Sequence, residues 1–408
     1  GIKDSVEMMM ADMYKAGRGF NHPELARKFA SDAPGVCAML DECGVQLKDK
    51  VIRLGGHSAP RALVPEAASG GGIVIPIHKW LKAHGVKFQN RTQVTELVLS
   101  DGKVKGVQCN VGYNWNDRTS AKTARIGTRS AVVVCTGGWG QDNDFIKTTM
   151  PAYALLECTS QPGATAEMLR GLLKAGALPT MLDMYQLGPW ASPDEKGAGP
   201  GSFFADYAFA EGISINPKTG RRYMNELADR RTRAEAELKV LGESEKDKIN
   251  YPIAFCSEKT TEHAEGFKAA YRDGCVFRHA TVEDLAKDYE IPLPALKQQI
   301  AEYNEIVAGK RKDPFEKPLD VKQKLEAPFY SMRLTPKLHY CMGGIAITPK
   351  AEVISVETLN PIPGLYAAGE VTGGVHGMDR LGGCSSVDCL VFGLEAGKNA
   401  AALVGAKE

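Results

Sequence analysis

The residues best suited to chemistry lie near the C-terminus, in the run LYAAGEVTGGVHGMDRLGGCSSV (365–387). A short apolar strand is expected to end in Gly369-Glu370, and a loop with five more glycines then carries His376, Asp379 and Arg380 to a helix from about Ser385. A helix N-terminus presents free N–H groups and a partial positive charge, so it can stabilise an anion. Glu370 can accept hydrogen bonds from sugar hydroxyls. The run therefore predicts a site for an anionic, hydroxyl-bearing ligand.

Two further glycine-rich segments can bring backbone close to a ligand. The run AVVVCTGGWG (131–140) is an apolar stretch that delivers Gly137-Gly138, and Cys135 within it is expected to be a core residue. Residues 54–72, which begin with Leu54-Gly55-Gly56, are expected to form a long loop before a helix from about Ile73 to Ala83. The strands and helices that flank residues 54–72 and 131–140 must bring these two glycine-rich segments to the ligand.

The chain pattern is that of an α/β protein interrupted by an insertion. Residues 4–48 are expected to form two helices, 88–99 and 104–111 a hairpin turning at Asp101-Gly102, and 124–135 a third strand. A helix is expected over 163–176. From 179 to 334 proline, aromatic and charged residues increase, and the alternating αβ character returns afterwards. We expect helices in this insertion near 231–241, 258–272, 282–289 and 293–308.

This organisation predicts three segments: 1–178 and 335–408 as two parts of one Rossmann-like domain, and 179–334 as an inserted α+β domain. A chain of 408 residues is long enough for two cores. The net charge of +1 gives no field that would favour nucleic acid. No run of 18 apolar residues occurs to span a bilayer. The ten cysteines show no C-x-x-C spacing and are expected to be buried thiols, although Cys37 with Cys43, or Cys384 with Cys389, could pair.

Several blocks resemble, in order, the flavoprotein family of fumarate reductase and flavocytochrome c, which is related to succinate dehydrogenase flavoproteins. The run AAGEVTGGVHGMDRLGG resembles its C-terminal flavin signature. The other blocks are LGGHSAPR (54–61), AVVVCTGGWG (131–140), QPGAT (161–165), GRRYMNELADR (220–230) and LHYCMGG (338–344).

The resemblance implies an FAD-dependent reductase of the C=C bond of an unsaturated carboxylic acid, with an active site between a flavin domain and a capping domain. Hydride would pass from flavin N5 to the β-carbon. Arg230 matches the proton donor, Arg380 the arginine that binds the carboxylate, and His339 or Tyr340 would assist it. The residues expected to bind FAD are Gly55, Gly56, Gly137, Gly138, Gly369, Glu370, Gly382, Gly383, Ser385, Ser386 and Val387.

One departure from the family concerns the cofactor. The N-terminal G-x-G-x-x-G fingerprint that cradles the pyrophosphate is absent, so we expect an upstream segment or a separate chain to supply it. No nicotinamide site is visible, and the resemblance suggests a cytochrome c or quinol-linked electron donor. It also favours the bacterial periplasm, whereas the ten cysteines favour a reducing compartment.

A second departure concerns the substrate. Where fumarate reductases carry a histidine before Pro-Thr and a Thr-Glu-Ala-Val-Arg run, this chain has YQLGPW (185–190) and FFADYAF (203–209). Without those cations we expect a monocarboxylate with an aromatic or apolar tail, of the aryl acrylate, urocanate or methacrylate type. Asp206 falls within one position of the lost glutamate and would replace it in the family's proton relay. The expected pocket residues are Tyr185, Trp190, Phe204, Tyr207, Met342 and Gly343.

Other readings remain open. The aromatic residues could simply pack the inserted domain, and the enzyme could be a fumarate reductase proper. A flavin dehydrogenase of the ketosteroid type shares the expected fold but would use tyrosines as acid and base, and would not need Arg230 and Arg380 together. A non-catalytic flavoprotein subunit is the third alternative, motivated by the missing fingerprint.

Overall fold

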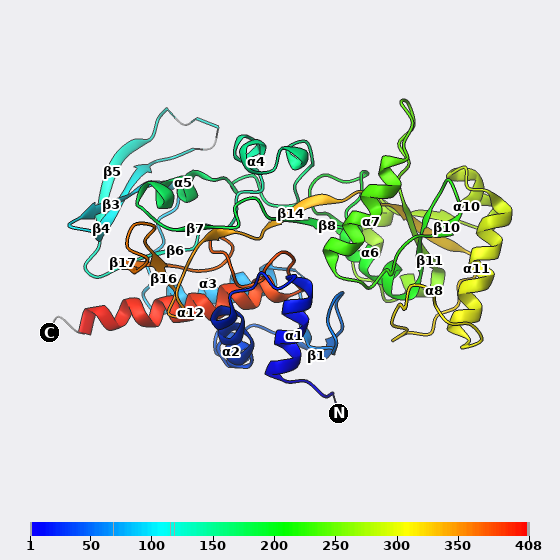
Figure 1. Cartoon of the computed structure of the whole chain (residues 1–408), viewed down its shortest axis with the longest axis horizontal. Helices are drawn as coiled ribbons and strands as arrows, with labels where there is room; N and C mark the ends of the chain where they lie inside the picture. Colours follow the sequence, from blue (N-terminus) through cyan, green and yellow to red (C-terminus); the bar gives the residue numbers. More distant parts are fainter. Residues whose placement is uncertain (1, 68, 115, 118, 406–408) are drawn as a thin grey trace. The chain divides into compact units, whose positions relative to one another are not determined.

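The computed structural model describes residues 2–67, 69–114, 116–117 and 119–405, and these divide into two compact units (Figure 1). Unit 1 comprises residues 1–154, 162–185 and 340–408, and unit 2 comprises 155–161 and 186–339. The chain passes between the units on either side of residues 155–161, and again within strands β8 (Tyr185–Gly188) and β14 (Lys337–Cys341), a few residues beyond the expected limits of the insertion.

Unit 1 is organised around a parallel pair of strands. β17 (Pro361–Ala367) pairs with β6 (Val132–Val134) in parallel and with β16 (Glu352–Ile354) in antiparallel. The closing helix α12 (Cys384–Gly405), red in Figure 1, packs against β17, β6 and helix α2 (Pro23–Glu42). Helix α1 (Val6–Ala16) packs on α2, so the two expected N-terminal helices are present.

The meander of unit 1 confirms one expectation and corrects another. β3 (Thr92–Ser100) and β4 (Lys103–Val111) form the expected hairpin, and its turn residues Asp101 and Gly102 both have positive φ, 53° and 70°. The expected third strand is wrong as a single element. It divides into β5 (Lys122–Gly127), which pairs with β4, and β6, which belongs to another sheet.

Shorter elements complete unit 1. The segment expected to be a loop over 54–72 contains a strand at 62–65 that pairs with a strand at 47–52, so that expectation was wrong in part. The remaining elements are β1 (Leu47–Ile52), β2 (Ala62–Pro65), α3 (Gly71–Ala83), α4 (Asn143–Thr149), a 3-10 turn at Pro151–Tyr153, α5 (Glu167–Lys174), β7 (Pro179–Thr180) and β15 (Gly344–Ile345).

Unit 2 is built on an antiparallel sheet with a core on each face. Its strand order is β10 (Arg221–Arg222), β9 (Ile213–Asn216), β11 (Ile253–Ser257), β13 (Phe329–Arg333) and β12 (Phe277–His279). Because side chains alternate along a strand, Ile253 and Phe255 enter one core while Ala254 and Cys256 enter the other.

Helices cover both faces of this sheet. α10 (Val282–Asp288) and α11 (Leu293–Val307) contribute to the core of Ile253, and α6 (Pro200–Glu211) and α9 (Phe267–Arg272) to that of Ala254. Helix α7 (Arg230–Gly242) is present as expected. The helix expected over 258–272 instead divides into α8 (Glu258–Thr261) and α9, because Gly266 between them adopts a left-handed φ of 75°.

The cysteines differ in part from the expectation of buried thiols. All ten cysteines are free; seven are buried, while Cys37, Cys135 and Cys389 are exposed. The expectation that Cys135 is a core residue is therefore wrong, because this thiol follows the end of the short edge strand β6. Among the described residues, no helix combines the length and apolar character that crossing a bilayer would require.

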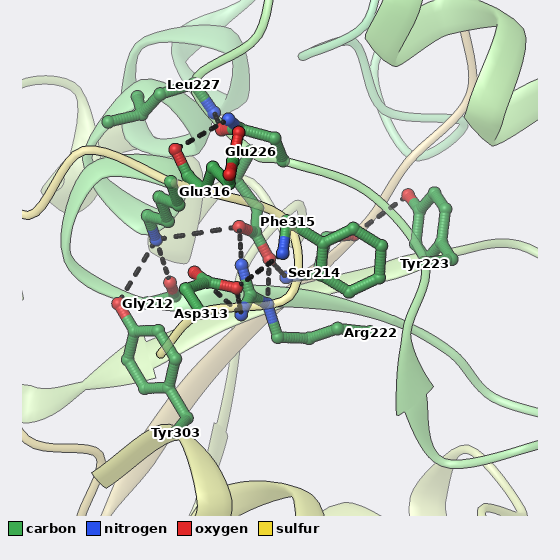
Figure 2. A network of polar contacts seen from close by, with 12 residues as sticks. Gly212, Ser214, Arg222, Tyr223, Glu226, Leu227, Tyr303, Asp313, Phe315 and Glu316 are labelled. Atoms are coloured by element: carbon green, nitrogen blue, oxygen red, sulfur yellow. Dashed lines mark hydrogen bonds and ion pairs between the residues drawn. The ribbon is translucent and has the colours of Figure 1, made fainter. Parts of the chain in front are cut away.

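Unit 2 also buries a network of charges (Figure 2). The Arg222 guanidinium donates to both oxygens of Glu226, at 2.8 and 2.7 Å, and to both oxygens of Asp313, at 3.0 and 3.1 Å. Lys317 lies 3.7 Å from Glu226 and donates to the hydroxyl of Tyr303. Burial lowers the pKa of Lys317 to about 8, although Glu226 opposes this shift. Two buried cations thus balance two buried anions.

Breaking this network at its centre should destabilise the protein. In Arg222→Met, Glu226 and Asp313 would lose their shared partner in a water-free interior, so the free energy of unfolding should fall by about 3–5 kcal/mol. Arg311→Met is the matched control, because its guanidinium is 44% exposed and lies 3.5 Å from Glu302. That change should cost about 0–1 kcal/mol. Urea unfolding followed by circular dichroism measures both, and equal losses would contradict the argument.

Candidate functional site

The parallel pair β6 and β17 brings two glycine-containing turns to the same edge of a sheet. Ala367 pairs with Val134, and the Ala368 N–H donates to the Val134 carbonyl at 3.1 Å. Gly137 and Gly369 then both adopt left-handed φ values, 75° and 76°. Ligands of open α/β sheets bind beyond the carboxyl ends of the strands. The two glycine turns that the sequence predicted for the cofactor therefore lie at the same sheet edge.

Glu370 is held against the first of these turns. Its Oε1 accepts a hydrogen bond from the Cys341 N–H at 2.8 Å, and the Gly138 N–H also donates to the carboxylate. Burial raises the pKa of Glu370, and these two donors oppose the shift. A Cβ on Gly138 would lie 2.4 Å from Oε1 of Glu370 and 3.0 Å from Sγ of Cys341. A side chain at position 138 would therefore displace the Glu370 carboxylate.

The N-terminus of α12 forms the second part of the site. Gly383, with φ of 77°, precedes the helix, whose first turn contains Ser385, Ser386 and Val387. A Cβ on Gly382 would meet Leu54 at 2.9 Å, and Leu54 leads directly into Gly55-Gly56. Leu54 therefore lies close to Gly382, beside the start of the helix.

A series of hydrogen-bonded polar side chains holds the Gly382 carbonyl in place. The Nε2 atom of His57 lies 2.9 Å from this carbonyl and donates to it, so Nδ1 of the neutral ring can accept from Arg61 at 3.1 Å. Arg61 in turn donates to Asp12 at 2.6 Å, and Asp12 accepts from the Ser58 N–H and hydroxyl at 2.8 Å. These hydrogen bonds orient the Gly382 backbone just before the N-terminus of α12.

The turn between α1 and α2 holds the glycine loop that precedes α12. Three hydrogen bonds do so: from the His22 N–H to the Gly374 carbonyl at 2.6 Å, from the Asn21 amide to the Val375 carbonyl at 3.0 Å, and from the Met378 N–H to the Gly17 carbonyl at 3.0 Å. The loop is therefore fixed by residues more than 350 positions away in the sequence.

Arg380 is buried within this loop. Its guanidinium lies over the ring of Tyr340, 4.4 Å from the centroid, and donates to the Leu381 carbonyl at 3.0 Å. Only 3% of Arg380 is exposed. Burial raises the pKa of Tyr340 well above its usual range, so its hydroxyl stays protonated. The result is a positioned cation stacked on a neutral phenol.

Unit 2 assembles a different group of predicted residues around Arg230. This arginine donates to Oε1 of Gln186 at 3.0 Å and lies over the Trp190 ring, 5.2 Å from its centroid. Trp190 meets His339 edge-on at 4.6 Å, and Nδ1 of His339 lies 2.7 Å from the Thr159 hydroxyl. Arg230, Trp190 and His339, which the sequence assigned to the catalytic and pocket groups, thus lie close together within unit 2.

Trp190 occupies the space that a side chain at position 188 would need. A Cβ built on Gly188 would lie 1.6 Å from Cζ3 of the indole and 2.3 Å from Cη2. The indole therefore fills the position where the family resemblance leads one to expect a histidine side chain. Trp190 itself is 7% exposed.

The other predicted pocket residues divide between the units. Phe204 is fully buried in the core of unit 2 and packs on Phe267, so it acts as a core residue and not as a pocket wall. Tyr185 is also buried, and its hydroxyl contacts Nε1 of Trp139 at 2.9 Å and Thr149. Tyr207 is partly buried in unit 2, while Met342 and Gly343 belong to unit 1.

Sequence reasoning missed several residues that position the site. His57 and Arg61 lie inside the block LGGHSAPR (54–61), whose resemblance to the family was a usable signal for both. Asp12 and Asn21 lie on α1 and at the start of α2 and carry no motif, so nothing in the sequence separated them from ordinary helix residues. Gly188 lies in the block YQLGPW, where the family carries a histidine, but the sequence carries no separate signal for it.

The geometry fits an anionic cofactor in unit 1. The left-handed Gly137 has open space where a side chain would stand, and at Gly383 only Leu54 comes within 4 Å, at 3.7 Å. These openings lie beside a buried carboxylate and beside a helix N-terminus, which suit hydroxyl groups and a negatively charged edge respectively. The exposed thiols Cys135 and Cys389 belong to the same region, after β6 and within α12.

Comparisons with known proteins agree with this geometry. The model of the FAD binding domain family matches residues 1–386. The acrylate reductase flavoprotein subunit of Shewanella woodyi is 39% identical over 98% of this chain and 79% of its own length. The urocanate reductase of Eggerthella lenta is 29% identical over 99% of this chain, which spans 65% of that protein. The open form of a flavocytochrome c3 fumarate reductase superposes with a TM-score of 0.74 at 28% identity, over 99% of this chain and 68% of that one.

The close approach at Gly138 makes a testable prediction. In Gly138→Ala the new methyl group would displace the Glu370 carboxylate, so the purified protein should retain at least ~10-fold less flavin per chain, measured by absorbance. Gly393→Ala on α12 is the control, because a Cβ there meets nothing within 4 Å. If both variants retain flavin like the parent chain, Gly138 and Glu370 do not contribute to the cofactor site.

Proposed function

This chain belongs to the FAD-binding family of fumarate reductase and related flavoproteins and is a flavin-dependent oxidoreductase of unsaturated carboxylates, and we propose that its substrate is a small α,β-unsaturated monocarboxylic acid. Monocarboxylates were expected from the sequence. The small members of that group, of the acrylate and methacrylate type, are favoured here over those with an aryl tail.

FAD would be held by the glycine turns at 137–138 and 369–370, by Glu370 and by the first turn of α12. When bound, FAD supplies the hydride for the double bond. At this site the buried Glu370 carboxylate would bind hydroxyl groups. The free N–H groups at the N-terminus of the 22-residue helix α12 would stabilise negative charge.

Arg380 is proposed to bind the reacting carboxylate. Addition of hydride to the β-carbon shifts electron density toward the carboxylate, and a guanidinium beside it stabilises the developing charge. The ring of Tyr340 holds one face of Arg380, and the Leu381 carbonyl occupies one of its N–H groups. Because these contacts fix its orientation, the Arg380 guanidinium can hold a carboxylate in one position.

Arg230 is proposed to donate the proton to the α-carbon. Its contacts with Gln186 and Trp190 fix the direction of the guanidinium. Asp206 lies within electrostatic range of Arg230, and burial raises the pKa of this carboxyl. An acid with a raised pKa can return a proton to the arginine, which fits the role expected for Asp206.

The observation that carries the substrate proposal is the indole of Trp190 over Gly188. A histidine side chain at position 188 cannot coexist with this indole, and an apolar ring offers no charge for a second carboxylate. The bulk of the indole also leaves less room beside Arg230 for an aryl tail. A further support is the 39% identity with an acrylate reductase subunit.

A fumarate reductase remains the second candidate, because relatives of that activity match almost the whole chain at 28–30% identity. The ketosteroid dehydrogenase of Rhodococcus jostii shares the fold at 22% identity. A likeness at this level of identity shows the fold alone and says nothing about the reaction. The electron donor is proposed to be a protein partner such as a cytochrome, and a further polypeptide segment is proposed to complete the pyrophosphate site.

A panel of unsaturated acids tests this proposal. With a reduced artificial electron donor, acrylate should be reduced with at least ~10-fold higher kcat/KM than fumarate or cinnamate. Trp190→Ala should open the site and raise the ratio for cinnamate over acrylate about 10-fold or more. Trp80→Ala, which removes an indole from helix α3, should leave the ratio unchanged. Faster reduction of fumarate than of acrylate by the unaltered protein would refute the substrate assignment.

A further inference from the structure

A buried histidine and a buried aspartate contact each other in unit 1, and the proposed function uses neither of them. His376 belongs to the glycine loop that carries Arg380, and Asp388 lies in the second turn of helix α12. His376 is 5% exposed and Asp388 is 1% exposed. Nε2 of His376 lies 3.5 Å from Oδ2 of Asp388, and this contact joins the loop to the helix that follows it.

Packing alone does not explain this pair. Among the described residues, neither Nε2 of His376 nor Oδ1 of Asp388 has a hydrogen-bond partner. Polar atoms that are removed from water without a hydrogen bond cost free energy. Apolar residues of similar volume often replace such a pair with no loss of stability. The pair is therefore better explained by the neighbouring side chains that it orients.

The imidazole of His376 connects Asp388 to the arginine of the site. Its ring meets the ring of Tyr340 edge-on, with 6.2 Å between the centroids and an angle of 74° between the planes. The same imidazole meets Phe29 of helix α2 edge-on at 5.6 Å. The Arg380 guanidinium lies in turn over the Tyr340 ring, 4.4 Å from its centroid. Observed contacts thus lead without a gap from Asp388 through His376 and Tyr340 to Arg380.

The backbone of His376 is fixed, whereas the rotation of its ring depends on the side chains around it. Gly374 and Gly377, on either side of His376, adopt φ values of 96° and 64°. A Cβ on Gly377 would lie 2.5 Å from the Gly17 carbonyl oxygen, so the end of α1 packs tightly against the loop. The torsion that rotates an imidazole about its Cβ–Cγ bond has only a broad, roughly two-fold preference. The contact with Asp388 therefore selects one orientation of the ring.

We propose that His376 and Asp388 are positioning residues that hold the Tyr340 ring, and through it the Arg380 guanidinium, in the orientation that receives the reacting carboxylate. This inference rests on the proposed reduction of an unsaturated acid. Arg380 contacts the substrate, whereas His376 and Asp388 act only through Tyr340. Negative charge on the carboxylate grows as hydride adds to the β-carbon, so the arginine stabilises the transition state more than the bound substrate. A guanidinium whose direction is no longer fixed would therefore slow turnover more than it weakens binding.

The proposal is tested by Asp388→Asn, which keeps the size of the side chain and removes the carboxylate that faces His376. With acrylate and a reduced artificial donor, kcat per bound flavin should fall about 10-fold, while KM should rise no more than about 3-fold. Asp288→Asn is the matched control, because it removes a carboxylate 2.9 Å from Nδ1 of another buried histidine, His279 of unit 2. Its kcat and KM should equal those of the unaltered protein. Equal kcat per bound flavin in the two variants would overturn the proposal and leave the proposed function standing.

A spectroscopic readout follows Arg380 without any turnover. In protein labelled with isotope-enriched arginine, the Nε–H nuclear magnetic resonance signal that is lost in Arg380→Gln reports the ring current of Tyr340. This signal should shift in Asp388→Asn and stay in place in Asp288→Asn. A signal that stays in place in both variants overturns the positioning role, whether or not an acid is reduced. A shift that is seen although the unaltered protein reduces no unsaturated acid supports the positioning of Arg380 and refutes the proposed function alone.

A second variant keeps the test decisive if Asp388→Asn does not fold, which thermal melting shows. The double change His376→Leu with Asp388→Leu leaves no polar group of the pair in the interior, so the fold should be retained. This variant should show the same loss of kcat per bound flavin and a shifted Arg380 signal. If the folded double variant reduces acrylate as fast as the unaltered protein, the pair only packs the interior and the proposal is wrong.

Discussion

The contact between Glu370 and Gly138 is the constraint on which the cofactor site depends. Two parallel strands, far apart in the sequence, end side by side, and each continues into a left-handed glycine. Gly138 has no side chain, so the Glu370 carboxylate can occupy the space beside its backbone and accept its N–H. This arrangement sets the direction of the glycine loop that follows, and with it the position of Arg380 and of the start of α12. Residues from α1 and the α1–α2 turn then fix the loop through backbone carbonyls.

Unit 2 uses burial in two different ways. In the network of Arg222, Glu226 and Asp313 every charge has a close partner, which is the pattern of a group that stabilises the fold. Along α7 the buried Glu237 has none among the described residues, which is the pattern of a group kept protonated. Trp190 belongs to neither class. Its indole fills the space over Gly188 and meets both Arg230 and His339, so one side chain shapes the surroundings of the proposed proton donor.

The sequence predicted the family, the cofactor and most long elements, because glycine-rich strand ends and helix starts are local features. The hairpin at Asp101-Gly102 and the helix over Ser385–Leu403 needed no tertiary information. The missed features depend on contacts across the chain. The His57 ring is oriented by Gly382, and the indole position of Trp190 is visible only in three dimensions. The apolar neighbours of Cys135 predict a core residue, yet the thiol is exposed because the preceding strand is short and lies at a sheet edge.

The most direct test of the account follows the flavin itself through a single turnover. The bound flavin is reduced without oxygen, acrylate is added, and the return of the oxidised absorbance is timed in the unaltered protein, in Arg380→Gln and in the exposed-arginine control Arg91→Gln. The account predicts rapid reoxidation in the unaltered protein and the control, and a rate at least ~100-fold lower in Arg380→Gln with flavin still bound. Equal rates in all three proteins, or flavin that stays reduced with every unsaturated acid, would contradict it.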